Sequence, residues 1–292
     1  MLFYFICLKG GRELKHIILR RFLKNKLAMI GFIFLTLFFL IAIFAPILTT
    51  YARDSIDLMS IESHPSLKHL LGTDELGRDV FTRLLYGGRV SLGVAVSATV
   101  LQLFIGVTLG SISGFYGRWI DNAIMRLVDT VMCFPFFVIA ITIAAVIGPS
   151  VWNIILIIGL LQWTGVARIV RAEILSLKQS EFIEAARAMG LSNFEIIFNH
   201  LLPNTLSPVI VNATLSVAQG ILMEAGLSFL GLGVKQPQPS WGNILSAAQS
   251  MRVLQYEWWL WIPAGLLVFL SVLSINFVGD GLRDALDPKM KI

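Results

Sequence analysis

Charged residues and cysteines are both scarce in this chain. Asp, Glu, Lys and Arg make up 14% of its 292 residues, whereas 56% of the residues are hydrophobic and the mean hydropathy is +0.78. Soluble domains carry about 25% charged residues, so this composition indicates a membrane protein. The two cysteines, Cys7 and Cys133, lie far apart in the sequence and indicate no disulfide framework.

Motifs for several kinds of chemistry are also absent. No Gly-Lys dipeptide occurs, which excludes a G-x-x-x-x-G-K-[ST] phosphate loop, so ATP hydrolysis would need another chain. No G-x-S-x-G nucleophile turn occurs either. The segment 73–79 is acidic but lacks the ligand spacing of an EF-hand calcium loop, so we expect its charges to pair locally or to meet a partner protein. We predict that the chain is not an enzyme and has no metal site.

The histidines do not suggest a metal centre. They are His16, His64, His69 and His200. They form no H-E-x-x-H motif and no close pair at helical spacing. We therefore expect each of them to be a solvated or interfacial side chain.

Long apolar runs dominate the sequence. About 20 apolar residues suffice to cross roughly 30 Å of hydrocarbon, and lipid offers the backbone no hydrogen-bonding partner, so each run is expected to be helical. We predict an all-α polytopic membrane protein with six transmembrane helices. They are 27–49, 91–115, 122–147, 151–170, 205–230 and 257–279.

The distribution of Lys and Arg predicts the orientation. These residues gather in 1–26, in 168–187 and at the C-terminus, and they are sparser in the loops 51–90 and 233–256. Basic residues favour the cytoplasmic side, so both termini are predicted to be cytoplasmic. The same rule accounts for the formal net charge of +5 without a nucleic-acid partner.

The N-terminal segment carries two features. The apolar start, MLFYFIC, has no preceding basic region and no A-x-A-like cleavage site, so we interpret it as uncleaved. Residues 11–26 then predict an amphipathic helix that lies along the inner membrane face; an ordinary basic flank is the alternative. Its apolar positions are Leu14, Ile17, Ile18, Phe22 and Leu23.

Small and charged residues inside the spans predict helix contacts. Gly106, Gly110 and Gly114 follow one another at intervals of four residues, so they form a flat face on which a neighbouring helix can pack closely. The spacing does not identify that helix. The alternative is that these glycines have no packing role, since glycine is common in membrane helices. Asp129 is expected to pair with Arg126 or Arg118.

A polar, helix-forming island interrupts the apolar spans at 180–203. Ser180 can cap a first helix, and Gly190 fits the left-handed position after its end. Ser192 and Glu195 form an S-x-x-E capping box for a second helix, which Pro203 is expected to terminate.

Each helix of the island has a characteristic surface. In the first, Ala185, Ala186 and Met189 provide a small, low-relief surface beside Glu184, where another protein could seat closely. An amphipathic loop that lies on its own membrane domain is the alternative. In the second, the apolar stripe consists of Phe194, Ile197, Phe198, Leu201 and Leu202.

The island resembles the EAA loop of ABC-importer permeases. The matching residues are Glu184, Ala185, Ala186, Gly190, Leu202 and Pro203, at the family's spacing and between the fourth and fifth spans. In that family the loop forms the coupling helices that insert into a groove of a cytoplasmic ATPase. The resemblance therefore implies an ATPase-coupling role for these six residues.

Other stretches resemble the C-type permeases of dipeptide, oligopeptide and nickel importers. They are 69–89, 227–233, 239–242 and 279–288. The resemblance implies a second, related permease, two ATPase subunits that bind ATP and Mg, an extracytoplasmic solute-binding protein, and a multi-pass location in the bacterial or archaeal inner membrane. It also implies three regions: a cytoplasmic segment 1–26, a first span with external loop 27–90, and a permease core 91–292 that contains the coupling loop 171–204.

Three questions stay open at the level of sequence. Glu224, late in the fifth span, either lines the translocation path or its outer gate, or forms a structural hydrogen bond to the Gly-rich turn that follows. The solute is expected to be a di- or oligopeptide, with nickel or a metallophore complex as the alternative. A self-sufficient secondary transporter that uses Asp129 and Glu224 as proton sites, and a non-transporting scaffold, are the rival classes.

Overall fold

The computed structural model of this protein describes residues 11–286. Within this range the chain is helical, and its β-type pairing is a single bridge between Thr73 and Asp79, which confirms the predicted all-α class. The interpretations of the apolar start and of Cys7, and the end of the 279–288 stretch, lie outside the described residues.

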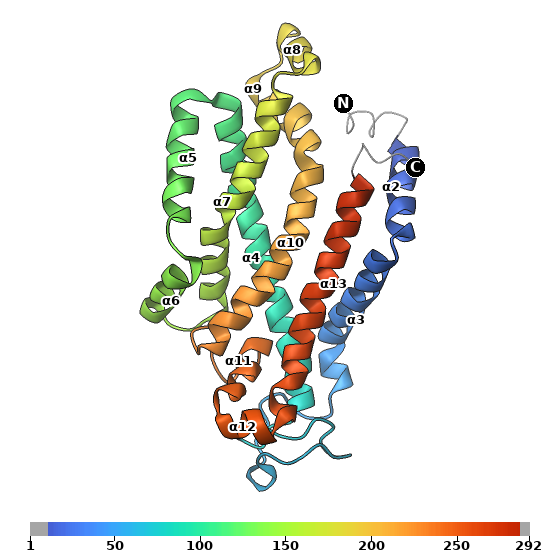
Figure 1. Cartoon of the computed structure of the whole chain (residues 1–292), viewed down its shortest axis with the longest axis vertical. Coiled ribbons are helices and arrows are strands. Elements are labelled where there is room, and N and C mark those ends of the chain that lie inside the picture. The colour runs from blue at the N-terminus through green and yellow to red at the C-terminus, as the bar shows by residue number, and fades with distance from the viewer. Residues whose placement is uncertain (1–10, 287–292) are drawn as a thin grey trace.

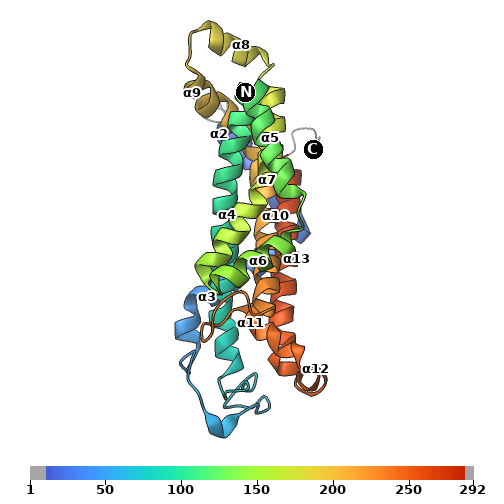
Figure 2. The same ribbon diagram turned by 90° about the vertical axis from the view of Figure 1, so that its left-hand side faces the viewer.

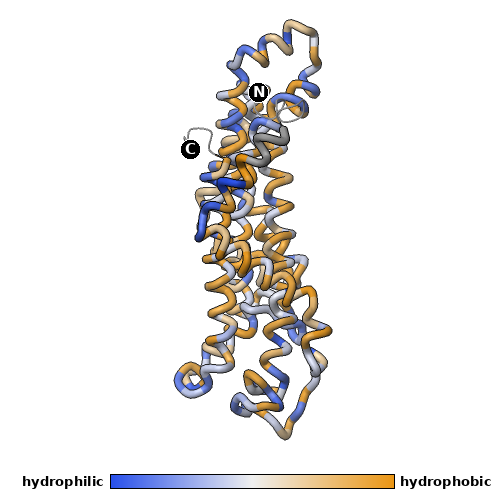
Figure 3. The backbone as a smooth tube through the Cα atoms, turned by 90° about the vertical axis from the view of Figure 1, so that its right-hand side faces the viewer, coloured by the Kyte–Doolittle hydropathy of each residue, from blue (hydrophilic) through white to orange (hydrophobic). Residues whose placement is uncertain are grey.

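Five helices are long and apolar enough to cross a membrane, and a bent helix pair forms either a sixth, broken span or a re-entrant loop (Figure 1). The five are α3 (Lys26–Leu48), α4 (Val80–Tyr116), α7 (Val151–Leu177), α10 (Leu202–Phe229) and α13 (Ile262–Leu286). The pair is α5 (Arg118–Met132) and α6 (Phe136–Ile147). In the hydropathy colouring of Figure 3, hydrophobic segments prevail along the middle of the long helices.

The prediction of one continuous helix over 122–147 is wrong, because α5 and α6 meet at 82°. The break contains Pro135, whose backbone is extended at ψ 129°. Proline has no N–H for the helical ladder and disfavours helical geometry in the residue before it, so the chain turns there.

Short elements connect the spans. They are α2 (Gly11–Lys24), η1 (Leu58–Ser60), α8 (Glu181–Ala188), α9 (Asn193–Glu195), the π-helical η2 (Ile196–Leu201), α11 (Trp241–Leu245), η3 (Ser246–Gln249), α12 (Met251–Tyr256) and η4 (Trp258–Leu260). The predicted sixth span begins too early, because η4 precedes α13. The predicted second span begins too late, because α4 already starts at Val80, where the Asp79 carboxylate caps it by accepting the N–H of Thr82 at 2.8 Å.

The glycine face of α4 packs against α7, which identifies the partner that the sequence left open. A Cβ atom on Gly106 would lie 2.5 Å from Val166 Cβ, and one on Gly110 would lie 2.6 Å from the carbonyl oxygen of Ala167. Gly114 repeats the close approach one turn later. The two backbones therefore approach more closely than any larger residue would allow.

The elements divide between two ends of the bundle (Figure 1). We call one the α8 end, which also holds α2 and the last turn of α13, and the other the α12 end, which also holds α11 and the loop 49–79. The helix predicted over 11–26 is present as α2, and Asn25 separates it from α3 by capping the N–H of Ala28 at 3.2 Å. The membrane side of each end, and the interfacial placement of α2, stay predictions.

Candidate functional site

α8 and the residues that follow it form a loop that projects beyond the spans (Figure 2). Ile183 and Ala186 are fully buried in a cluster with apolar residues of α4, α7, η2 and α10. Ala186 therefore anchors α8, which corrects the expectation that it contributes to an exposed surface. Glu184 and Ala185 are exposed, and the Glu184 carboxylate makes no hydrogen bond or ion pair with another described residue.

Gly190 closes the end of α8 as predicted. Its φ angle is +81°, in the left-handed region that favours glycine. Its N–H donates to the carbonyl of Arg187 at 2.9 Å, and the N–H of Leu191 donates to the carbonyl of Ala186 at 3.2 Å. These bonds satisfy the last carbonyls of α8 and reverse the chain toward α9.

The capping box at the next helix start is confirmed. The Ser192 hydroxyl accepts the N–H of Glu195 at 3.3 Å, and the Glu195 carboxylate accepts the N–H of Ser192 at 2.8 Å. Ser180 occupies the predicted cap position of α8, but its hydroxyl donates to the carbonyl of Leu177 instead of capping the helix.

The second helix of the loop does not end at Pro203, so that prediction is wrong. The chain passes from α9 through the π-helical η2 directly into α10, with the N–H of Leu202 donating to the carbonyl of Ile197. Pro203 lies in the first turn of α10, and the Asn204 side chain donates to the carbonyl of His200 at 2.6 Å. The wider π turn changes the hydrogen-bond register, which accommodates the proline without breaking the helix.

The apolar stripe of this segment differs from the predicted one. Ile196, which was not predicted, is buried with Ile197 and Leu201. Phe194 and Phe198 are 67% and 51% exposed, and their ring centroids lie 4.3 Å apart. The buried residues differ from the predicted ones because Ile196–Leu201 form a π-helix, in which side chains point in directions other than those of an α-helix.

Met189, at the end of α8, is 72% exposed, so the loop presents three exposed apolar side chains in addition to the exposed Glu184 and Ala185. We call these five residues the loop face. Exposed apolar side chains that gather on one surface are typical of protein contacts.

Charged side chains tie the base of the loop to α4 and α5. Lys178 donates to the carbonyl of Phe115, and the Arg187 guanidinium lies 6.0 Å from the centre of the Phe115 ring. Burial, with neighbouring cationic side chains, lowers the pKa of Lys178. Arg171 makes two hydrogen bonds to Asp121, at 2.5 and 2.6 Å. Sequence reasoning missed these contacts, because the partners lie far apart in the chain and form no local motif.

Glu224 is fully buried between α4 and α10. It accepts hydrogen bonds from the Ser91 hydroxyl at 2.6 Å and the Ser228 hydroxyl at 2.7 Å. Those hydroxyls accept the backbone N–H groups of Trp241 at 3.1 Å and Val234 at 3.1 Å. The carboxylate thus links both helices to the segment after the Gly-rich turn, and this geometry favours the structural alternative over solute contact.

Asp129 pairs with Arg168 of α7 at 2.5 Å, with both side chains about half exposed, and not with Arg126 or Arg118 as expected. About three turns of α5 separate the carboxylate from Arg118, whereas α7 brings Arg168 alongside it.

In the segment 73–79, Asp74 and Asp79 pair with nearby side chains, which is one of the two predicted alternatives, whereas Glu75 forms no ion pair with a described residue. Asp74 lies 2.7 Å from Arg78 and 3.4 Å from Arg83. His69 Nδ1 lies 3.0 Å from Asp79, and both side chains are buried. His69 is therefore a structural side chain, which corrects its expected solvated or interfacial placement.

Residues 106–292 match the family described as "Binding-protein-dependent transport system inner membrane component". The chain belongs to this family. Residues 14–65 match a second model, "N-terminal TM domain of oligopeptide transport permease C". The chain is thus the transmembrane permease subunit of an ABC importer, in a bacterial inner membrane.

Several relatives align over nearly the whole chain. The dipeptide transport system permease DppC of Alkalihalophilus pseudofirmus is 47% identical over 92% of this chain and 88% of its own length. The oligopeptide permease OppC of Bacillus subtilis is 41% identical over 93% and 88%. The glutathione permease GsiD of Pectobacterium atrosepticum is 40% identical over 93% and 90%.

A solved structure of the MetNI methionine ABC transporter shares the fold of this permease. Its TM-score is 0.56 at 21% identity, and the match covers 70% of this chain and 96% of that one. At this identity the likeness concerns the fold alone.

Proposed function

We propose that this permease forms half of the translocation path for di- or oligopeptides and that two separate ATPase subunits drive it through the loop face. The observation that carries the proposal is the geometry of the loop. The loop exposes three apolar side chains and the carboxylate of Glu184, which has no partner among residues 11–286, and buried residues and ion pairs hold its base rigidly.

The six residues of the EAA resemblance take different roles in this proposal. Glu184 and Ala185 meet the ATPase, while the buried Ala186 holds α8 against the spans. Gly190 sets the angle between α8 and α9. Leu202 and Pro203, both half-buried, lie where η2 joins α10, so a push on the loop face moves α10 as a rigid body.

The topology and partners follow from the same proposal. The α8 end faces the cytoplasm, where ATP and Mg bind to the ATPase subunits and not to this chain. The α12 end faces the exterior, where a solute-binding protein delivers the peptide. A second, related permease completes the path, and the lipid bilayer surrounds the outer faces of the pair.

Peptides are favoured as solutes because the aligned relatives are named for dipeptides, oligopeptides and glutathione. Nickel has no comparable support, and the described residues contain no group of three or more His, Cys, Asp or Glu side chains that could hold a metal ion. A self-sufficient secondary transporter is disfavoured by membership of a binding-protein-dependent family.

Uptake of a labelled dipeptide by cells that lack or carry this chain tests the proposal. We expect uptake to require the chain and ATP, to fall moderately in Glu184→Gln and to be abolished in Glu184→Lys, because the reversed charge repels the basic rim expected around an ATPase groove. Membrane levels of both variants should equal the wild type. Full ATPase retention and normal uptake in Glu184→Lys would contradict the coupling role.

A further inference from the structure

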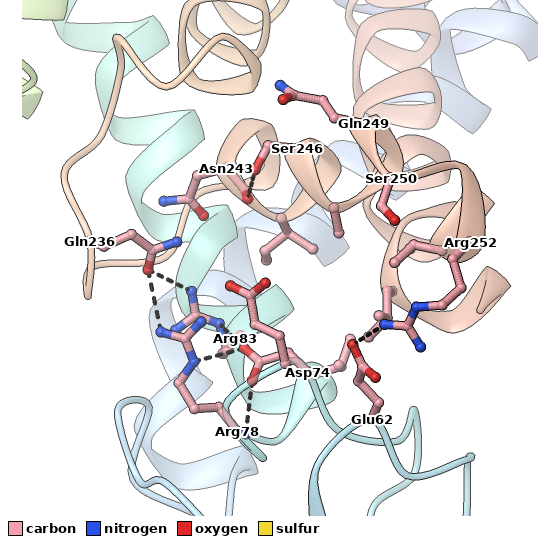
Figure 4. Close-up of a pocket in the computed structure, with 16 residues that line it drawn as sticks. Glu62, Asp74, Arg78, Arg83, Gln236, Asn243, Ser246, Gln249, Ser250 and Arg252 are labelled. Atoms are coloured by element: carbon pink, nitrogen blue, oxygen red, sulfur yellow. Dashed lines mark hydrogen bonds and ion pairs between the residues drawn. The ribbon is translucent and has the colours of Figure 1, made fainter. Parts of the chain in front are cut away.

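A cavity of about 340 Å³ opens at the α12 end, away from the loop face (Figure 4). The start of α4, the segment from Gln236 to Leu260 and the loop 49–79 enclose it. Its volume falls within the range of roughly 300–1,000 Å³ that is typical of small-molecule sites. Charged side chains line it on two sides, and their arrangement is not symmetric.

One wall carries two buried arginines. Arg78 and Arg83 have side chains only 6% and 4% exposed, and both pair with the single carboxylate of Asp74. Both also donate to the side-chain oxygen of Gln236 at 3.3 Å, and Arg83 donates to the carbonyl of Pro237. A guanidinium has more N–H groups than these bonds use, so this wall retains donors for one further anionic acceptor.

The facing wall carries an excess of negative charge. Arg252 alone pairs with two carboxylates, those of Glu62 and Glu257. The second oxygen of Glu257 is buried without a hydrogen-bond partner among the described residues. Glu257 lies behind this wall, and Glu62 lines the cavity, so one arginine serves two acids and this side is short of a cation. Glu75, whose exposed side chain forms no hydrogen bond or ion pair with a described residue, also lines the cavity, and its charge acts on Arg83 of the opposite wall.

We propose that the cavity binds a free short peptide as a zwitterion, with its carboxylate on Arg78 and Arg83 and its ammonium group on Glu62. Paired guanidiniums hold a carboxylate in a fork geometry that no neutral group reproduces. The six charged lining residues sum to zero formal charge, so an overall neutral, dipolar ligand matches them better than a phosphate or a metal ion does. This inference rests on the proposed peptide transport and adds a solute site at the entrance of the permease.

Three probes test the assignment on the full-length chain in lipid nanodiscs, with binding followed by saturation-transfer NMR. They are dialanine, dialanine amide, which lacks the carboxylate, and N-acetyl-dialanine, which lacks the ammonium group. We expect dialanine to bind about tenfold or more tightly than either analogue, because each loses a charge-assisted hydrogen bond. Arg78→Gln should weaken dialanine by a similar factor and abolish its advantage over the amide.

Two further variants keep the test independent of folding. Ser250 is exposed at the cavity wall, so Ser250→Trp should block all three probes without touching the arginine cluster. Arg89 is an exposed arginine on the same helix as Arg83 and outside this cavity, so Arg89→Gln should bind like the wild type. Equal binding of dialanine and its amide, or unchanged binding in Ser250→Trp, would overturn the proposal.

A comparison with transport separates this inference from the proposed function. Normal ATP-driven peptide uptake by the complete importer, without dialanine binding to the chain, overturns the cavity assignment and leaves the function intact. A different result is that dialanine does not bind the wild type, while Arg78→Gln weakens docking of the solute-binding protein. In that case the arginine wall recognises a carboxylate of that protein, and the proposal is again wrong. Absence of any peptide uptake would refute the function itself.

Discussion

Gly190 offers a way to strain the coupling loop without causing a clash. Its φ angle is +81°, and a Cβ atom placed there would meet no atom within 4 Å. A substitution therefore acts through the backbone alone. The left-handed region costs an ordinary L-residue roughly 1–2 kcal/mol, and more for a β-branched residue, whereas asparagine tolerates it better.

This strain is large enough to change the turn. A penalty of roughly 1–2 kcal/mol shifts the balance between the observed turn and its alternatives by a factor of about 5–30. Relief by rotation to negative φ would break the hydrogen bonds from Gly190 to Arg187 and from Leu191 to Ala186. α8 would stay packed through its buried Ile183, but its angle to α9 would change.

We therefore expect peptide transport to decrease in the order wild type, Gly190→Asn, Gly190→Ala, Gly190→Val. The assay is ATP hydrolysis and dipeptide uptake by the complete importer in proteoliposomes. Uptake per ATP should fall along the series, while insertion and thermal stability of the chain change little. Wild-type coupling in Gly190→Val would refute the argument that this turn fixes the angle of the loop.

Three other changes test the remaining parts of the structure. Gly110→Leu should destabilise the permease by about 1–3 kcal/mol or more, because the carbonyl of Ala167 blocks the new side chain, whereas Gly165→Leu, in open space, should melt like the wild type. Glu224→Gln should keep near-normal uptake, whereas Glu224→Ala should lose about 1–3 kcal/mol of stability, because it removes the hydrogen bonds to Ser91 and Ser228. Loss of uptake in Glu224→Gln at unchanged stability would instead indicate that Glu224 is part of a gate. Burial, and then the nearby Glu62, raise the pKa of Glu257, so its contribution to stability is present at acid pH and is lost as pH rises through that raised value. The wild type should accordingly gain more thermal stability than Glu257→Gln between pH 7 and pH 5, and parallel melting curves would contradict this assignment.

Features that depend on neighbouring residues were predictable from the sequence. The capping box of Ser192 and Glu195 is a hydrogen-bonding pattern within one turn, so it forms wherever that turn forms. Gly190 was predictable because few other residues tolerate the angle that ends α8 there. Five of the six spans were predictable because lipid requires every long apolar run to satisfy its own backbone.

The bend at Pro135 shows the limit of the same reasoning. Proline marks a place where a helix can break, but many membrane helices accommodate it, as Pro203 does here through the π turn. The surrounding helices decide between these outcomes, because they determine whether the freed backbone groups find partners.

The sequence alone thus determined the class of this protein, five of its spans and the position of its polar loop, because local hydrogen bonds and hydropathy control these features. The tertiary structure decided which helix receives the glycine face, that Arg168 pairs with Asp129, and that Arg78 and Arg83 share a cavity with Glu62. Such contacts join residues that are distant in the chain, and they arise only when the packed helices bring those residues together.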